Sequence, residues 1–590
     1  MKQAGAYPIN PVTPGASGCP RILNAEGAPA TPAPSWRIHL DGARKEALET
    51  GRTRLLVAGI VFCLAFLVVA GRLVDLALLG PAAEPRLAAA GTPATQNFRR
   101  ADIVDRNGVL LATSLPTASL YADAREIIDP RQAAARLVAE LPDLSHDRVL
   151  AKLTSTAGFI WLRRNLTPRQ TYAVNRLGIP GLHFLQAEKR VYPQGREASH
   201  VLGLTDVDGR GTAGVECFFD GPLRRGGGAL ELSIDIRIQA MLRRELAAAV
   251  TKFDALGAAG LVLDVRSGET LGMVSLPDFD PNVPAGARGE AAFNRVSKGV
   301  YEMGSTFKLI NTAMALDSGT VTLRDGYDAT KPIRVARFTI NDFHARNRWL
   351  SVPEILVYSS NIGAAKMALD VGGETQRTYL DRFGLLKPAA TELPEVGVPL
   401  SPTHWRDINT MTIAYGHGIA VSPVQLAGAV GAIVNGGIRM PVTILKHHQG
   451  APFIGERVVS AETSSAMRRL MRLVVQKGTG RKADVPGYRV GGKTGTAEKL
   501  IAKRYQANAL ISSFVGAFPT DAPRYVVLVL IDEPKGKKST FGYATGGWVA
   551  APVVGRLVRQ IAPLVGMAPA GEEKEPAPGN PLFIPVKGGP

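Results

Sequence analysis

The stretch YEMGSTFKLINTA, from Tyr301 to Ala313, places a serine and a lysine three residues apart at a predicted helix start. On a helix, Ser305 and Lys308 would share one face. A serine hydroxyl needs a positioned base to become a nucleophile, and a lysine can serve when burial or a nearby cation removes its proton. Serine is also a favoured N-cap, and Ser-x-x-Lys arises by chance about once in a chain of this size. The stretch alone leaves a helix cap and a nucleophile both open.

A second segment, VYSSNIGAAKM, joins two helical patterns and carries Ser359 and Asn361. From such a loop both side chains can point into one cleft, the hydroxyl to pass protons and the amide to hold a substrate carbonyl. Serine and asparagine also favour helix N-termini, so capping is the alternative interpretation.

A third segment, VGGKTGTAEK, lies on a strand that is predicted to begin over Tyr488–Val490. Lys493, Thr494 and Thr496 offer one cation and two hydroxyls, which suit a carboxylate. Gly495 removes a side chain where another backbone could approach, and an extended peptide could add to the strand edge. A Gly-rich turn is the alternative. A phosphate loop is excluded because the pattern G-x-x-x-x-G-K-[ST] is absent.

Strand patterns at both ends of the C-terminal half enclose a helical middle. ELSIDIRIQ reads as a strand entering a helix, and AAGLVLDVRSGETLGMVS as a hairpin turning at Ser267-Gly268. Helical patterns begin at Ser305, Val352, Ser422 and Glu462, and ISSFVGAFP and RYVVLVLIDEP follow as strands. This order predicts one α/β domain with an antiparallel sheet whose first strands pair with its last.

The preceding region, residues 90–225, reads as an elongated spacer domain. IVDRNGVLLA predicts a hairpin around Asn107-Gly108. PRQAAARLVAELP and TPRQTYAVNRLG predict two amphipathic helices.

Leu55–Ala70 carries no charge, and the apolar character continues to Gly80, interrupted by Arg72 and Asp75. This length suits a helix that spans a bilayer, which needs about 20 residues. A buried core helix and a signal peptide are the alternatives, but a signal peptide would not normally follow so long a preamble. Basic residues precede the run, which places residues 1–54 in the cytoplasm and the large C-terminal body outside. Arg72 and Asp75 share a helical face, where they could pair, snorkel or face a partner helix.

The formal charge of +18 favours anionic partners such as membrane surfaces. Nucleic acid is not indicated, because zinc-finger spacings, long basic runs and base-stacking motifs are missing. Under the predicted topology Cys19, Cys63 and Cys217 lie in three compartments, so no intrachain disulfide is expected. Cys217 is expected to be a buried small hydrophobe.

Together, Ser-x-x-Lys, Ser-x-Asn and Lys-Thr-Gly-Thr, in that order inside one α/β domain, form a set typical of penicillin-binding proteins and serine β-lactamases. The sequence resembles class B penicillin-binding proteins, the monofunctional transpeptidases of bacterial wall synthesis. DRNGVLLATS, RVYPQG, GTAGVECFFDGPLR, AYGHGIAVSPVQLAGA and GGWVAAPVV extend the resemblance from about residue 98 to 560. The SSN form resembles the division-specific type, penicillin-binding protein 3. Arg100-Ala101 departs from the usual Arg-Gly, which makes the spacer's first strand less certain.

The resemblance implies an α/β (α+β) penicillin-binding, serine β-lactamase-like domain with an antiparallel sheet, an α+β pedestal before it and one N-terminal transmembrane helix. The implied parts are a disordered cytoplasmic tail (1–54), the membrane helix (55–80), the pedestal (81–228), the transpeptidase domain (229–566) and a flexible tail (567–590).

The resemblance also implies catalytic roles. Ser305 attacks the carbonyl between two terminal D-alanines of a stem peptide, and Lys308 takes its proton. Ser359 relays protons to the leaving D-alanine with help from Lys493. An amine of a neighbouring stem peptide then resolves the acyl-enzyme and makes the cross-link.

Substrate binding is implied for Asn361, which holds the donor's amide, and for the Lys493-Thr494-Gly495-Thr496 segment, which holds its carboxylate. The backbone N–H groups of Ser305 and Thr496 form the implied oxyanion hole. No metal or organic cofactor is called for.

The implied partners are stem peptides, β-lactams, the membrane, a polytopic glycan polymerase and other division proteins. The implied location is the inner membrane at the division septum, with the catalytic domain outside the cytoplasm. Three rivals stay open: an elongation-type transpeptidase, a β-lactamase and a non-enzymatic β-lactam sensor. A β-lactamase would need a water-activating group, and the segment between Asn361 and Lys493 offers no obvious counterpart of the class A glutamate motif.

Overall fold

The computed structural model describes residues 42–78, 99–335, 338–447, 450, 452–501 and 504–571. The chain divides into two compact units, Met1–Thr95 and Gln96–Pro590. Most of the predicted N-terminal tail, including Cys19, and residues 572–590 of the C-terminal tail lie outside the described residues.

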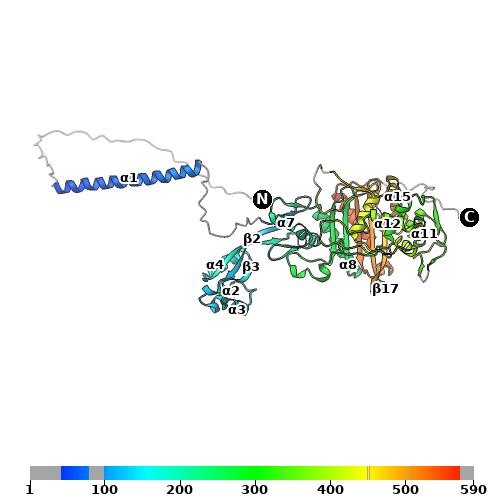
Figure 1. The fold of residues 1–590 in the computed structure, drawn as a ribbon, viewed down its shortest axis with the longest axis horizontal. Coiled ribbons are helices and arrows are strands. Elements are labelled where there is room, and N and C mark those ends of the chain that lie inside the picture. The colour runs from blue at the N-terminus through cyan, green and yellow to red at the C-terminus, as the bar shows by residue number, and fades with distance from the viewer. Residues whose placement is uncertain are drawn as a thin grey trace, which may run out of the picture. The chain divides into compact units, whose positions relative to one another are not determined.

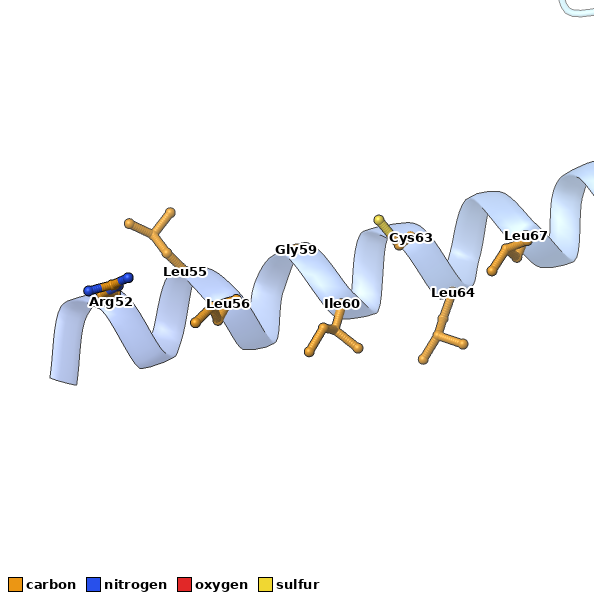
Figure 2. Close-up of a pocket in the computed structure, with 8 residues that line it drawn as sticks. All are labelled: Arg52, Leu55, Leu56, Gly59, Ile60, Cys63, Leu64 and Leu67. Carbon is orange, nitrogen blue, oxygen red and sulfur yellow. The ribbon is translucent and has the colours of Figure 1, made fainter. Parts of the chain in front are cut away.

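The first unit contains helix α1 (Gly42–Leu78), drawn in blue in Figure 1. Its segment Arg54–Gly71 has a mean hydropathy of 2.5 and none of it is buried against the rest of the chain. Figure 2 shows apolar side chains such as Leu55, Ile60 and Leu64 projecting from it. Of the described helices, α1 alone is long and apolar enough to cross a membrane. The side chains of Arg72 and Asp75 lie outside the description.

The second unit begins with a small sheet in the order β3-β2-β1-β7, with β4 paired along β2. Its strands are β1 (Ile103–Val104), β2 (Leu110–Ala122), β3 (Ile160–Leu166), β4 (Leu182–Val191) and β7 (Leu230–Glu231). β1 and β2 pair antiparallel, which confirms the hairpin around Asn107-Gly108. The ELSIDIRIQ segment gives only the two-residue strand β7, so the longer strand predicted there is wrong.

Three helices pack on this sheet through apolar side chains such as Leu120, Leu137 and Leu166. They are α2 (Pro130–Glu140), α3 (His146–Leu153) and α4 (Pro168–Arg176). α2 and α4 confirm the two predicted amphipathic helices, and each begins with a proline after a capping side chain, Asp129 or Thr167. Short elements complete the region: α5 (Ser199–Leu202), β5 (Leu204–Thr205), β6 (Gly211–Ala213), α6 (Gly214–Phe218) and α7 (Asp220–Arg225).

A five-stranded antiparallel sheet forms the centre of the C-terminal region, in the order β16-β17-β18-β8-β9. Its strands are β8 (Gly257–Asp264), β9 (Thr270–Leu276), β16 (Gly491–Ile501), β17 (Arg504–Phe518) and β18 (Tyr525–Asp532). β18 pairs with β8, which confirms that the first strands pair with the last. β8 and β9 form the predicted hairpin, and Gly268 at its turn has φ +78°.

Helices cover both faces of this sheet. On one face α8 (Ile236–Phe253) and α16 (Ala550–Leu564) share a core with Val262 and Val527. On the other face α9 (Lys308–Asp317), α14 (Pro423–Val434) and α15 (Ala461–Lys477) pack near Leu261 and Leu263. The remaining helices are α10 (Val352–Tyr358), α11 (Asn361–Val371), α12 (Gly373–Arg382) and α13 (Asp407–Ile413). The short pairs are β10 (Gly326–Asp328) with β13 (Trp349–Ser351), β11 (Ile333–Val335) with β12 (Phe338–Ile340), and β14 (Ile438–Arg439) with β15 (Glu456–Arg457).

Two further expectations need correction. Tyr488–Val490 is not a strand, because Arg489 takes a left-handed backbone conformation (φ +41°) and β16 begins only at Gly491. Cys217 is partly exposed rather than buried, at the end of the short helix α6.

A buried ion cluster ties the start of the second unit to its later segments. The fully buried Glu216 carboxylate accepts from Arg100 Nε at 2.7 Å and from Arg190 Nε at 2.7 Å. The three side chains come from segments up to 116 residues apart. Since one carboxylate serves two buried guanidinium groups, its loss would leave two buried cations without their common partner.

We predict that Glu216→Gln lowers the free energy of unfolding by about 3–5 kcal/mol, the usual cost of breaking a buried ion pair from one side. Thermal unfolding of the purified protein measures this as a lower Tm. Glu140→Gln, at an exposed position on α2, is the matched control. Equal Tm values for the two variants would contradict the structural role of the cluster.

Candidate active site

Ser305 lies inside a 3-10 turn, Gly304–Phe307, that runs directly into α9. It is not the N-cap of that helix, so the capping expectation is wrong: Phe307 holds the N-cap position and makes no side-chain cap. Residues i and i+3 eclipse in a 3-10 turn. Accordingly Lys308 Nζ donates to Ser305 Oγ at 2.8 Å.

Lys308 is completely buried and meets three side-chain oxygens. Its ammonium nitrogen lies 2.8 Å from Ser305 Oγ, 2.7 Å from Asn361 Oδ1 and 3.3 Å from Ser359 Oγ. Burial lowers the pKa of Lys308 well below its usual range, the nearby charge of Lys493 lowers it further, and Asp342 opposes the shift. A lysine in this state can accept a proton from the serine that touches it.

The Ser-x-Asn segment connects α10 to α11, as predicted. Ser360 is the N-cap of α11, and its hydroxyl accepts from Gly363 N at 3.0 Å. N-capping is therefore the function of Ser360 and not of Ser359, which is the C-cap residue of α10 with a left-handed conformation (φ +61°). The Ser359 hydroxyl instead accepts from Lys308 Nζ at 3.3 Å and from Lys493 Nζ at 3.0 Å. It links the two lysines.

Asp342, which follows β12, holds the Ser-x-Asn segment in place and was not found from the sequence. Its Oδ1 accepts from the backbone N–H of Asn361 at 2.6 Å and of Ile362 at 3.0 Å. Its Oδ2 accepts from the Ser360 hydroxyl at 2.7 Å. The carbonyl of Asn341 accepts from Asn361 Nδ2 at 2.9 Å, which fixes the orientation of the amide. No spacing in the sequence relates Asp342 to a segment some 18 residues further on.

Lys493 lies on β16, as predicted, and is also completely buried. Its Nζ donates to Ser359 Oγ at 3.0 Å and to Thr494 Oγ1 at 3.2 Å. Burial lowers its pKa to about 7. The Thr494 hydroxyl also bonds that of Thr479 at 2.8 Å, a second contact that the sequence did not indicate.

The backbone of β16 lies close to the backbone of the turn Gly304–Phe307, which we refer to as the nucleophile turn. This confirms the prediction that Gly495 leaves room for another backbone. A Cβ at Gly495 would lie 2.5 Å from the carbonyl oxygen of Met303. A Cβ at Gly304 would lie 2.6 Å from the carbonyl oxygen of Thr496. Thr496 itself accepts from Gly546 N at 3.1 Å. The strand and the turn therefore fit together only because neither glycine carries a side chain.

The structure thus joins six of the predicted residues by direct hydrogen bonds: Ser305, Lys308, Ser359, Asn361, Lys493 and Thr494. Gly495 and Thr496 follow next on the same strand. Within the described ranges, no group of three or more His, Cys, Asp or Glu side chains is placed to hold a metal ion.

Two family profiles match the chain. Residues 95–216 match the penicillin-binding protein dimerisation domain, and residues 258–559 match the penicillin-binding protein transpeptidase domain.

Similar proteins cover most of the same length. The probable peptidoglycan D,D-transpeptidase FtsI of Caulobacter vibrioides is 44% identical over 79% of this chain and 82% of its own length. Peptidoglycan D,D-transpeptidase FtsI of Escherichia coli K12 is 32% identical over 80% of this chain and 84% of its own.

Among solved structures, the transpeptidase domain of Burkholderia pseudomallei penicillin-binding protein 3 is 36% identical, with a TM-score of 0.52, over 57% of this chain and 97% of that one. Penicillin-binding protein 3 of Mycobacterium tuberculosis shares the fold at 24% identity, with a TM-score of 0.64, over 81% of this chain and 98% of that one. Both profiles match in order along the chain, and these relatives cover most of its length. The chain therefore belongs to the penicillin-binding protein family and combines a dimerisation domain with a transpeptidase domain.

Proposed function

We propose that this chain is a peptidoglycan D,D-transpeptidase that works through an acyl-enzyme on Ser305. The observation that carries the proposal is the 2.8 Å contact between the Ser305 hydroxyl and the fully buried Lys308 amine. A serine with such a base beside it can attack a carbonyl. The relatives from Caulobacter vibrioides and Escherichia coli bear the same activity in their names.

In the acylation step, Lys308 accepts the Ser305 proton while Oγ attacks the carbonyl between the two terminal D-alanines. The C–N bond breaks, and the leaving D-alanine needs a proton on its amine. Ser359 is suited to deliver it, because its hydroxyl lies 3.3 Å from Lys308 Nζ and 3.0 Å from Lys493 Nζ. An amine from a second stem peptide then replaces Ser305 on the acyl group.

We assign substrate binding to the outer edge of β16, which is the first strand of its sheet. An extended donor peptide can add there by main-chain hydrogen bonds. The donor's carboxylate would be held beside Gly495 by the side chains of Lys493, Thr494 and Thr496. The donor's amide would be held by Asn361.

We assign the oxyanion hole to the backbone N–H groups of Ser305 and Thr496. The close approach of Gly304 to the Thr496 carbonyl, described above, supports this assignment because it brings the two backbones together.

The finer biological assignments are also part of the proposal. α1 would anchor the chain with residues 1–54 in the cytoplasm and with the pedestal (81–228), the transpeptidase domain (229–566) and the segment 567–590 outside it. The apolar segment of α1 supports the anchor. The FtsI relatives and the SSN sequence favour septal wall synthesis. A polytopic glycan polymerase and other division proteins are the partners that the family resemblance implies. β-Lactams would mimic the donor and trap Ser305.

A fluorescent penicillin tests the proposal. We predict stable labelling of the purified protein and its complete loss in Ser305→Ala, because the Ser305 hydroxyl makes the shorter contact with the buried Lys308 amine, 2.8 Å against 3.3 Å for Ser359. Ser401→Ala, an exposed serine, is the control and keeps its label. Rapid release of the label would favour a β-lactamase, stable labelling without stem-peptide cross-linking would favour a sensor, and no labelling would exclude a serine acyl-enzyme.

The pH dependence of acylation tests the buried lysines. Since Lys308 must be neutral to act as a base, the second-order rate constant for penicillin falls as acid protonates it. If Lys493 binds the carboxylate as a cation, the rate also falls on the alkaline side, with an apparent pKa of about 7. Stopped-flow measurements of this rate constant against pH, for the wild type and for Lys493→Ala, give both the acid limb and the alkaline limb of the profile. An alkaline limb near pH 7 that persists in Lys493→Ala would contradict the role given to Lys493.

A further inference from the structure

An acidic and aromatic cluster lies beside the nucleophile turn and takes no part in the chemistry described so far. It consists of Glu302, Tyr415, His417 and Tyr505, and we refer to it as the amine rim. Glu302 comes three residues before Ser305, Tyr415 and His417 follow α13, and Tyr505 lies on β17.

The Glu302 carboxylate is the centre of the amine rim. Its Oε1 accepts from the Tyr505 hydroxyl at 3.0 Å and from Gly418 N at 2.9 Å, and its Oε2 lies 3.2 Å from His417 Nδ1. The imidazole packs against both phenol rings, with centroid distances of 5.4 Å to Tyr415 and 5.7 Å to Tyr505. One carboxylate therefore holds two aromatic rings and a backbone turn together.

The amine rim borders the reacting groups. The Tyr415 ring centroid lies 5.9 Å from Lys308 Nζ. Gly304 N, next to Ser305, donates to the carbonyl of Gly416 at 3.3 Å. A group bound at the rim would thus be close to an acyl group carried by Ser305.

The electrostatic character of the amine rim is negative. Burial raises the pKa of Tyr415 to about 12, and the charge of Glu302 acts in the same direction. The pKa of Tyr505 is raised by burial and then by Glu302, with Glu498 of β16 adding to the effect. The rim reaches solvent mainly through Tyr505, which is about half exposed, whereas the side chains of Glu302 and His417 are 17% and 28% exposed and Glu302 Oε2 is buried.

We propose that the amine rim binds the protonated amine of the acceptor stem peptide and guides it to the acyl-enzyme. A carboxylate beside aromatic faces is the arrangement that recognises an ammonium group, through a charge-assisted hydrogen bond and cation–π contact. Such help is needed because the deeper part of the site contains two lysines, Lys308 and Lys493, whose positive forms would repel a cation. The proposal rests on the transpeptidase function proposed above.

The bound ammonium loses one proton to solvent, and its nitrogen attacks the ester carbonyl carbon. The bond from that carbon to Ser305 Oγ breaks, and the second amine proton passes through Lys308 to Ser305 Oγ. The products are an amide cross-link and the free serine.

The test uses a D-alanyl thioester as donor with the purified full chain in detergent. The acyl-enzyme partitions between hydrolysis and capture by an added amine, so the product ratio does not depend on how fast the acyl-enzyme forms. Two acceptors are compared at pH 7.5: Nα-acetyl-lysine amide, whose side chain is cationic, and hydroxylamine, which is uncharged. The variants are Glu302→Gln and, as an exposed acidic control on α12, Glu374→Gln.

We expect Glu302→Gln to lower the capture-to-hydrolysis ratio about tenfold for the cationic acceptor, the size of one charge-assisted contact. The ratio for hydroxylamine stays within about twofold, and Glu374→Gln resembles the wild type with both acceptors. Equal losses for both acceptors would show that Glu302 only supports the turn, and no loss for either would also overturn the proposal. Failure of the underlying function is distinct, because the wild type would then form no acyl-enzyme.

Discussion

The burial of two lysine side chains is the constraint on which the active site depends. Lys308 and Lys493 are both fully buried, and both meet the same Ser359 hydroxyl. Burying an ammonium group in this way is costly unless it loses its proton. The surrounding oxygens of Ser305, Asn361 and Thr494 give the amines hydrogen-bond partners without supplying a full compensating charge. The result is a pair of amines whose pKa values both lie below the usual range of lysine, with that of Lys493 at about 7.

In the pedestal, buried cations are stabilised by ion pairs rather than by loss of a proton. There the Glu216 carboxylate lies between Arg100 and Arg190, and Asp220 supplies Arg100 with a second carboxylate at 2.7 Å, so that two negative charges balance two positive ones. A paired cluster of this kind holds distant segments of the chain together and takes no part in proton transfer. The contrast separates a structural use of buried charge from a catalytic use, because arginine stays protonated and lysine can titrate.

Much of the site could be predicted because its chemistry depends on short spacings. Within each motif, one turn of backbone sets the distance between the two side chains, as for Ser305 with Lys308 and Ser359 with Asn361. The strand patterns at both ends of the C-terminal half predicted the antiparallel sheet. The rest depends on contacts that no local pattern contains. Asp342 and Thr479 act on motif residues 15 to 20 positions away in the sequence, through loops whose path is set by packing. Ser360 caps α11, whereas Ser305 caps no helix because it lies in a 3-10 turn, which spacing alone does not distinguish from an α-helical start.

A backbone conformation that spacing does not reveal also accounts for the strand that was wrongly predicted before β16. Tyr488–Val490 has apolar residues suited to a strand, but a left-handed Arg489 interrupts it before Gly491. The most direct test of the account is the position of the covalent adduct. After incubation with benzylpenicillin, proteolysis and tandem mass spectrometry should find one adduct, on Ser305 in the peptide that contains YEMGSTFK. An adduct on Thr306, Ser359 or Ser360 instead, or no adduct at all, would contradict the claim that the buried Lys308 makes Ser305 the nucleophile.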